Sequence, residues 1–127
     1  MEFDYTTATT KTFDEAVSRV QDEIVKADMR VLYVHDVQKT LVEKGFQRDP
    51  FKIIEFCSAK FANEFLNKDI KIGLCLPCKI NVYSKDGQTV ISGMRPIILS
   101  QFFPHSDLGS RPNEIDQIIQ NIINNAR

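Results

Sequence analysis

Three cysteines carry most of the chemistry that this sequence could perform. Cys75 and Cys78 form a C-x-x-C pair in the segment IGLCLPCKINVY, and Cys57 ends the segment FKIIEFC. A C-x-x-C pair is typical of a redox dithiol or of half a zinc site. Because the number is odd and the first residues carry no export signal, we expect free, reduced thiols rather than a disulfide framework.

The sequence around the C-x-x-C pair does not favour a redox role. Reactive pairs owe their low thiolate pKa largely to the start of a helix. The residues that follow Cys78, KINVY, alternate as a strand does, and neighbouring strand side chains point to opposite faces. Lys79 is therefore expected to point away from Cys78 and to stabilise its thiolate poorly.

A metal site would have to draw on residues that are far apart in the sequence. Structural zinc needs four ligands, and catalytic zinc needs three with an open position. The chain offers Cys57, Cys75, Cys78 and, at a distance, His35 as a mixed candidate set. Isolated cysteines are more often small buried hydrophobes, so we expect no metal.

The junction at Cys57 and Ser58 is the stronger candidate for a thiol site. Cys57 ends an expected strand, and Ser58 precedes an expected helix, whose N-terminus would lower the thiol pKa. Such junctions are common ligand sites in α/β architectures, but a buried core cysteine fits the same pattern. His35, at the end of RVLYVHD, is a weaker candidate for a catalytic base. No P-loop, dinucleotide fingerprint or nucleophile elbow is present.

Length and charge narrow the classes of function. A chain of 127 residues is expected to form one domain, residues 1–127, with one core. Sixteen basic and seventeen acidic residues give a formal charge of -1, so we expect neither nucleic acid nor an anionic membrane as a partner. The apolar run PIILSQFFP is far shorter than the roughly 20 residues of a membrane span. We therefore expect a cytoplasmic protein.

Several helix starts and one turn can be located from the sequence. Thr12 and Glu15 have the spacing of a capping box, Asp36 can cap a helix that stops before Gly45, and Ser58 can cap the helix AKFANEFLN. The segment KINVYSKDGQTVISGM predicts a β-hairpin through its Asp-Gly pair.

These elements predict an α+β fold: a single compact domain with a mixed sheet that contains a β-hairpin and is flanked by helices. The strand FKIIEFC is apolar on both faces, which predicts a central position with cover on both sides. The run PIILSQFFP and the isoleucine-rich last helix hold more apolar surface than one stripe needs. That surplus favours a homodimer interface.

The segments TFDEAV, DVQKTLVEKG, IIEFCSAKFANEFL and IGLCLPCKINVYSKDGQTVISGMRP resemble the domain-of-unknown-function family 302 over nearly the whole chain. The resemblance implies a compact α+β homodimer with no established activity. The family pattern falls on Cys57, Gly73, Leu76, Pro77, Cys78 and Tyr83. Cys75 departs from it, as does the Ser58-Ala59 pair, where the family usually has Asn-Pro. The resemblance therefore points to Cys57 with Cys78, brought together by the sheet, rather than to the C-x-x-C pair.

Three functions remain open on this basis. The leading hypothesis is a homodimeric binding module whose small-molecule ligand or protein partner sits at Cys57, Ser58, Pro77 and Cys78. The first alternative is a thiol-dependent redox or sulfur-transfer enzyme that uses Cys57 and Cys78. The second is a structural interaction module in which both cysteines are packing residues. The sequence names no cofactor.

Overall fold

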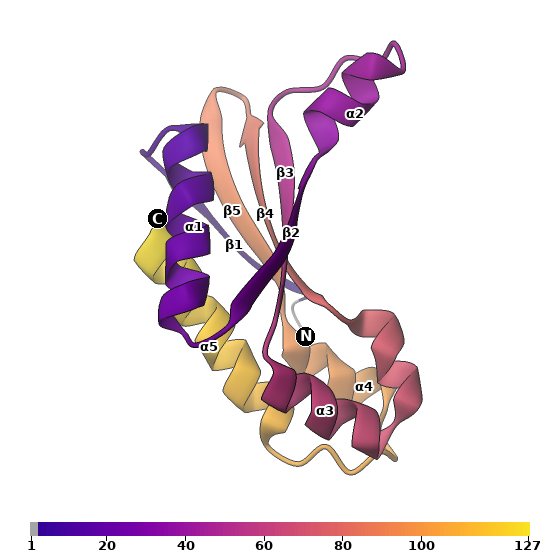
Figure 1. The fold of residues 1–127 in the computed structure, drawn as a ribbon. Helices are drawn as coiled ribbons and strands as arrows, with labels where there is room; N and C mark the ends of the chain where they lie inside the picture. Colours follow the sequence, from indigo (N-terminus) through magenta and orange to yellow (C-terminus); the bar gives the residue numbers. More distant parts are fainter. Residues whose placement is uncertain (1–2) are drawn as a thin grey trace.

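The computed structural model describes residues 3–127, which form a five-stranded sheet with helices on its faces and ends (Figure 1). The strands are β1 (Asp4–Thr9), β2 (Arg30–Asp36), β3 (Phe51–Cys57), β4 (Cys78–Lys85) and β5 (Gln88–Met94). The α-helices are α1 (Phe13–Lys26), α2 (Val37–Glu43), α3 (Ala59–Lys68), α4 (Leu99–Phe102) and α5 (Arg111–Ala126). Two 3-10 helices, η1 (Ile70–Cys75) and η2 (Pro96–Ile98), precede β4 and α4.

The local helix signals read from the sequence are confirmed. The Thr12 hydroxyl accepts the Glu15 N–H at 3.1 Å, and the Glu15 carboxylate accepts the Thr12 N–H at 3.4 Å. Asp36 caps α2, and Ser58 caps α3, each through its side-chain oxygen. These bonds satisfy N–H groups that the first helical turn would leave unpaired.

The α+β class is confirmed, but the sheet is not mixed. Its order is β1-β5-β4-β3-β2, and every neighbouring pair is antiparallel. The connection through α1 crosses the sheet between its two edge strands, β1 and β2, which run in the same direction but are not neighbours. The connection through α3 and η1 returns the chain antiparallel to β3, so no two neighbouring strands are parallel. The hairpin of β4 and β5 is confirmed, with positive φ angles of 51° at Asp86 and 78° at Gly87.

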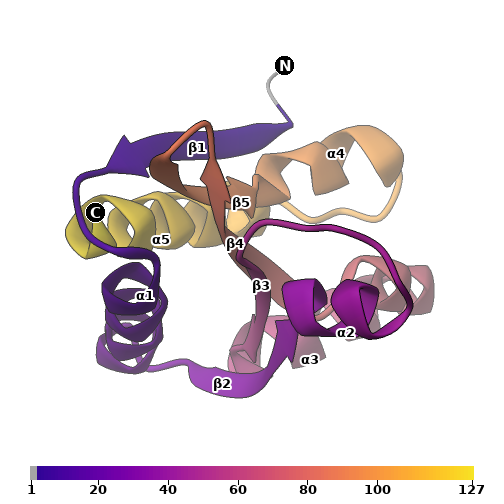
Figure 2. The same ribbon diagram turned by 90° about the horizontal axis from the view of Figure 1, so that it is seen from above.

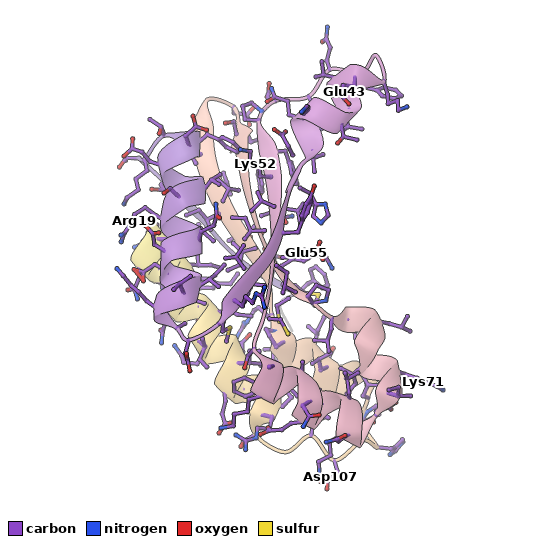
Figure 3. All side chains as sticks on the ribbon, viewed as in Figure 1. Arg19, Glu43, Lys52, Glu55, Lys71 and Asp107 are labelled. Carbon is purple, nitrogen blue, oxygen red and sulfur yellow. The ribbon has the colours of Figure 1, made fainter. Side chains whose placement is uncertain are left out.

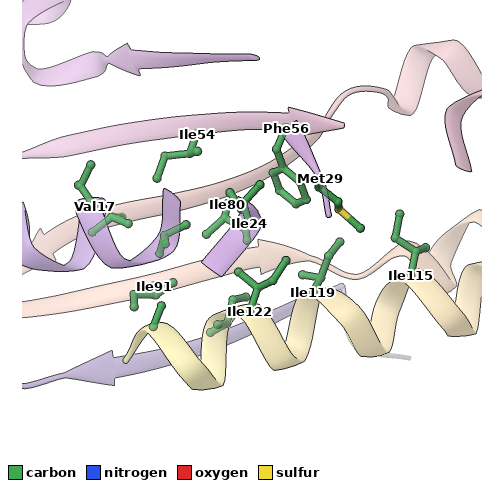
Figure 4. Close-up of a cluster of buried hydrophobic side chains, with 14 of the residues drawn as sticks. Val17, Ile24, Met29, Ile54, Phe56, Ile80, Ile91, Ile115, Ile119 and Ile122 are labelled. Atoms are coloured by element: carbon green, nitrogen blue, oxygen red, sulfur yellow. The ribbon is translucent and has the colours of Figure 1, made fainter. Parts of the chain in front are cut away.

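The core lies on one face of the sheet, under α1 and α5 (Figure 2). Figure 4 shows strand residues of this face, among them Ile54, Phe56 and Ile80, against residues of α1 and α5. At Gly93 of β5, an added Cβ would lie 3.0 Å from the Ile123 side chain, so the missing side chain allows α5 to approach the sheet closely.

The other face, which we call the open face, lacks this helical layer. In Figure 2, α1 and α5 lie on one side of the sheet and α2 lies on the other, whereas Figure 1 shows α3 at one end of the sheet. β3 is central between β2 and β4 as predicted, and its expected cover on both sides is only partial, because within residues 3–127 α2 alone packs against it on the open face. Ile54 is fully buried on the core face, whereas Phe51 and Ile53, on the open face, are half-buried. The apolar side chains of β3 therefore pack into the core on one face of the sheet and lie at a half-buried surface on the other.

The apolar surplus predicted for dimerisation is largely used inside the chain. The isoleucines of α5 that were expected to form a wide apolar face, and Ile98 and Leu99 of the PIILSQFFP segment, are mostly buried in the core. Phe102 of that segment remains exposed. Among residues 3–127, no helix is long and apolar enough to cross a membrane.

Candidate functional site

The sheet brings Cys57 and Cys78 to neighbouring strand ends but directs them to different faces. Phe56 of β3 stands opposite Cys78 of β4, so these two side chains share the core face. Cys57, the next residue along β3, stands opposite Arg30 of β2 and lies on the open face by alternation. Their backbones are close, but this arrangement does not favour a disulfide between them.

Both thiols have a raised pKa, which opposes the lowering expected from the start of α3. Burial, with a smaller contribution from the nearby Cys57, raises the pKa of the Cys78 thiol to about 12, and Lys79 only partly offsets these effects. Burial also raises the pKa of Cys57. Burial is therefore the cause of the Cys57 pKa shift, and the first-turn N–H of Phe61 is bound by the Ser58 side chain, at 3.4 Å. At neutral pH both groups are thiols rather than thiolates.

The other residues of the predicted corner have structural roles. The Ser58 side chain is the N-cap of α3. Pro77 follows a cis peptide bond with Leu76, between η1 and the first residue of β4. Cys75 ends η1 and packs against the core. Cys57, Ser58, Pro77 and Cys78 therefore lie at the neighbouring ends of β3 and β4, and ligand binding by these residues stays a prediction.

The mixed metal site considered from the sequence does not form. Within residues 3–127, no group of three or more His, Cys, Asp or Glu side chains could hold a metal ion. The reason is the direction of the side chains: Cys78 faces the core, whereas His35 lies at the far end of β2 beside Glu55. No metal or cofactor chemistry is derived from these residues.

A groove between α2 and the sheet is the feature of the open face best suited to a ligand. We call it the α2 groove; its volume is about 460 Å³, which lies within the usual range of small-molecule sites. It is lined by His35, Asp36, Val37, Thr40, Leu41, Ile53, Glu55 and Lys79. In Figure 3, Glu55 lies on this side of the sheet, whereas Lys52 lies toward α1. The groove therefore combines an apolar wall with a few charged side chains.

The charged residues of the α2 groove meet through the strand register. Glu55 of β3 stands between Tyr33 of β2 and Lys79 of β4. A His35 ring nitrogen contacts the Glu55 carboxylate, and the Tyr33 ring packs edge-on against His35 with ring centres 4.6 Å apart. The Lys79 ammonium forms no ion pair or hydrogen bond within the described part of the chain. The groove thus holds two carboxylates that contact protein donors, Asp36 and Glu55, and one cation without such a contact within residues 3–127, Lys79.

Asn81 is an unusual residue beside the groove. Its register partners are Ile53 of β3 and Ser92 of β5, which places it on the open face. The Asn81 amide oxygen is buried and accepts no hydrogen bond from residues 3–127. An unsatisfied buried acceptor costs about 1–3 kcal/mol, and such costs often mark sites that serve something other than stability.

Of the α2 groove residues, sequence reasoning singled out only His35 and the helix cap Asp36. Glu55 interrupts the apolar run FKIIEFC, and Lys79 is the charged residue at the start of an alternating strand. Those interruptions are the only signal in the sequence. Glu55 and Lys79 stand opposite each other only through the register of β3 with β4, and no local pattern fixes this register because the two residues are 24 positions apart.

Comparison with known proteins agrees with this fold and assigns no activity. The model of the family described as "Domain of unknown function DUF302" matches residues 5–126, so the chain belongs to this family. It is also similar to the crystal structure of an uncharacterized conserved DUF302 protein from Bacillus stearothermophilus. That likeness has 26% identity, covers 100% of both chains and gives a TM-score of 0.93. No curated protein matches the chain.

Proposed function

We propose that this member of the DUF302 family is a binding module and that the α2 groove is its ligand site. The observation that carries the proposal is a largely apolar groove on the open face, with His35, Glu55 and Lys79 brought to its edge from three adjacent strands. Concave apolar surface with a few convergent polar groups is the usual form of a small-molecule site.

The predicted corner extends this site along β3. Cys57 lies two residues beyond Glu55 on the same face of the strand, and Ser58 and Pro77 adjoin it in sequence and across the strand ends. In this proposal Cys57 is a neutral thiol at the far end of the bound molecule. Cys78 supports the corner from the core face and does not touch the ligand.

The thiol-enzyme alternative has less support than the binding module. A nucleophilic or sulfur-carrying cysteine needs an accessible thiolate near neutral pH. Burial raises the pKa of both candidate thiols, and Cys78 is on the core face. We therefore keep the structural interaction module, and not the enzyme, as the competing interpretation.

A steric block of the α2 groove tests the proposal. Thr40 lines the groove from α2 and is exposed, so Thr40→Trp should fill the groove without disturbing the core. Gln47→Trp is the matched control, because Gln47 is neutral and exposed but lies in the loop after α2. Saturation-transfer NMR with a fragment library should give binders to the wild type and to the control but not to the blocked variant. The same binders for all three chains, or none for any, would favour the structural module.

The remaining parts of the proposal concern assembly and location. We propose a cytoplasmic homodimer. Three free cysteines suit a reducing compartment, and large apolar side chains stay exposed at Ile70 and Leu74 of η1 and at Phe102 of α4. Sedimentation analysis should give twice the 14.6 kDa chain mass for the wild type, and Leu74→Ser should shift it toward the monomer. A monomer at all concentrations would contradict this part.

A further inference from the structure

The geometry points to small amphipathic oxyanions as the ligand class of the α2 groove: an apolar body with one carboxylate-like or sulfonate-like group. This inference rests on the proposed function, since it assumes that the groove binds a ligand. It specifies which end of the groove holds which part of the molecule, and it makes Lys79 the residue that selects for negative charge.

The acidic groups of the groove lining already contact protein donors, whereas its lysine has no acceptor in the described part of the chain. The Asp36 carboxylate accepts the Lys39 N–H at 2.9 Å as the cap of α2. The Glu55 carboxylate contacts His35. Both acidic groups therefore already have donors. The Lys79 ammonium carries three donors and has no hydrogen-bond or ion-pair partner among residues 3–127.

A ligand acceptor, rather than a ligand donor, complements the polar groups of the α2 groove. A ligand donor would share a carboxylate that already accepts the Lys39 N–H or contacts His35. A ligand acceptor meets the free ammonium of Lys79 without displacing any existing contact. Because charge-assisted bonds are the stronger ones, an oxyanion fits better than a neutral acceptor. Lys79 is exposed, so the anion reaches its ammonium from the solvent side, while the neighbouring Glu55 carboxylate is held by His35.

The apolar part of the ligand would pack against the apolar wall of the α2 groove. Val37 and Leu41 of α2 and Ile53 of β3 form a wall that no helix of the core layer covers. A volume of about 460 Å³ accommodates a body of two or three rings or a short branched chain. The anion at Lys79 then fixes the orientation of this body along the groove.

Two matched fluorescent probes test this selectivity. 8-Anilinonaphthalene-1-sulfonate and N-phenyl-1-naphthylamine share an aromatic body, and only the first carries an anion. Both are titrated against the full-length wild type, Lys79→Gln and Lys71→Gln. Lys71 is the charge-matched control, because it is an exposed lysine of η1 outside the groove lining. We expect Lys79→Gln to weaken the sulfonate probe about fivefold or more, to change the neutral probe less than twofold, and Lys71→Gln to change neither.

The outcomes separate this inference from the proposed function. If Thr40→Trp abolishes binding of both probes but Lys79→Gln leaves the sulfonate probe unchanged, the groove stands and the anion selectivity is overturned. Equal weakening of both probes by Lys79→Gln also overturns it, since the lysine would then act through its alkyl stem. If Thr40→Trp changes neither probe, the groove itself is not the site, and both proposals are overturned.

Discussion

The partly buried, core-facing thiol of Cys78 gives a quantitative test of the cysteine corner. Alkylation by iodoacetamide requires the thiolate. Burial raises the pKa of Cys78 from the ordinary value of 9.0 to about 12, so its thiolate population at neutral pH falls by about a factor of 10³. We therefore expect native Cys78 to react at least 10³-fold more slowly than the same residue in the urea-unfolded chain.

The assay is a time course of alkylation at pH 7.5, read residue by residue by peptide mass spectrometry. The unfolded chain provides the reference rate for each cysteine in its own sequence context. Cys57, whose pKa burial also raises, should be slowed as well. A native Cys78 that reacts within tenfold of its unfolded rate would refute the placement of its thiol in the core and would return the thiol enzyme to consideration.

The same shift makes stability depend on alkaline pH. The folded chain keeps Cys78 protonated to about pH 12, whereas the unfolded chain loses that proton above about pH 9. The stabilisation is therefore fully present below pH 9 and is lost as the pH rises toward 12. By pH 10 the loss amounts to about 1 kcal/mol of unfolding free energy. Cys78→Ala should remove this part of the pH dependence, and an unchanged alkaline slope in that variant would argue against the assignment.

Three substitutions, one of them with a matched glycine control, test packing and polar contacts around the sheet. Gly93→Ala forces a methyl group against α5 and should lower the unfolding free energy by about 1–2 kcal/mol. Gly73→Ala is the control and should change the unfolding free energy little, because the nearest atom to its added Cβ is 3.4 Å away. Equal effects of the two variants in thermal melts would refute the close approach of α5 to the sheet. Asp116→Ala removes the two bonds that the half-buried Arg95 donates to the Asp116 carboxylate, at 3.2 and 3.1 Å, so urea unfolding should show a loss of about 1–3 kcal/mol. A loss under about 0.5 kcal/mol would count against the pair. Asn81→Val removes an unsatisfied acceptor and should raise stability by about 1 kcal/mol; a clear loss would show that the amide is satisfied.

The local parts of the fold could be predicted because their causes are local. The caps at Thr12, Asp36 and Ser58 act on N–H groups three residues away, and the Asp86-Gly87 turn needs only its own two residues. The α+β class followed from these elements. The resemblance to the family, carried by segments along the whole chain, was confirmed by the match over residues 5–126.

The sheet order and its one-sided cover could not be predicted from the same patterns. The strand FKIIEFC reads as apolar on both faces, and only the assembled sheet shows that Ile54 is fully buried while Ile53 lines a groove. The antiparallel return through α3 and η1 is likewise a property of tertiary packing, because nothing within those helices sets the direction of the next strand.

The candidate site was predicted in part. Cys57 and Cys78 do lie at neighbouring strand ends, but the sequence alone could not weigh burial against the field of the α3 N-terminus, and burial prevails. The α2 groove was missed because Glu55 and Lys79 meet only through strand register. Residues that interrupt an apolar strand pattern were the one available signal.

The most direct test of the account is an amide chemical-shift map of the ¹⁵N-labelled full-length chain titrated with 8-anilinonaphthalene-1-sulfonate. We expect saturable amide chemical-shift changes that concentrate on the two sides of the α2 groove, at Leu41, Ile53 and Lys79. Shifts that concentrate instead on the exposed apolar residues Ile70 and Leu74 of η1 would contradict it, because the probe would then mark an apolar surface and not the groove.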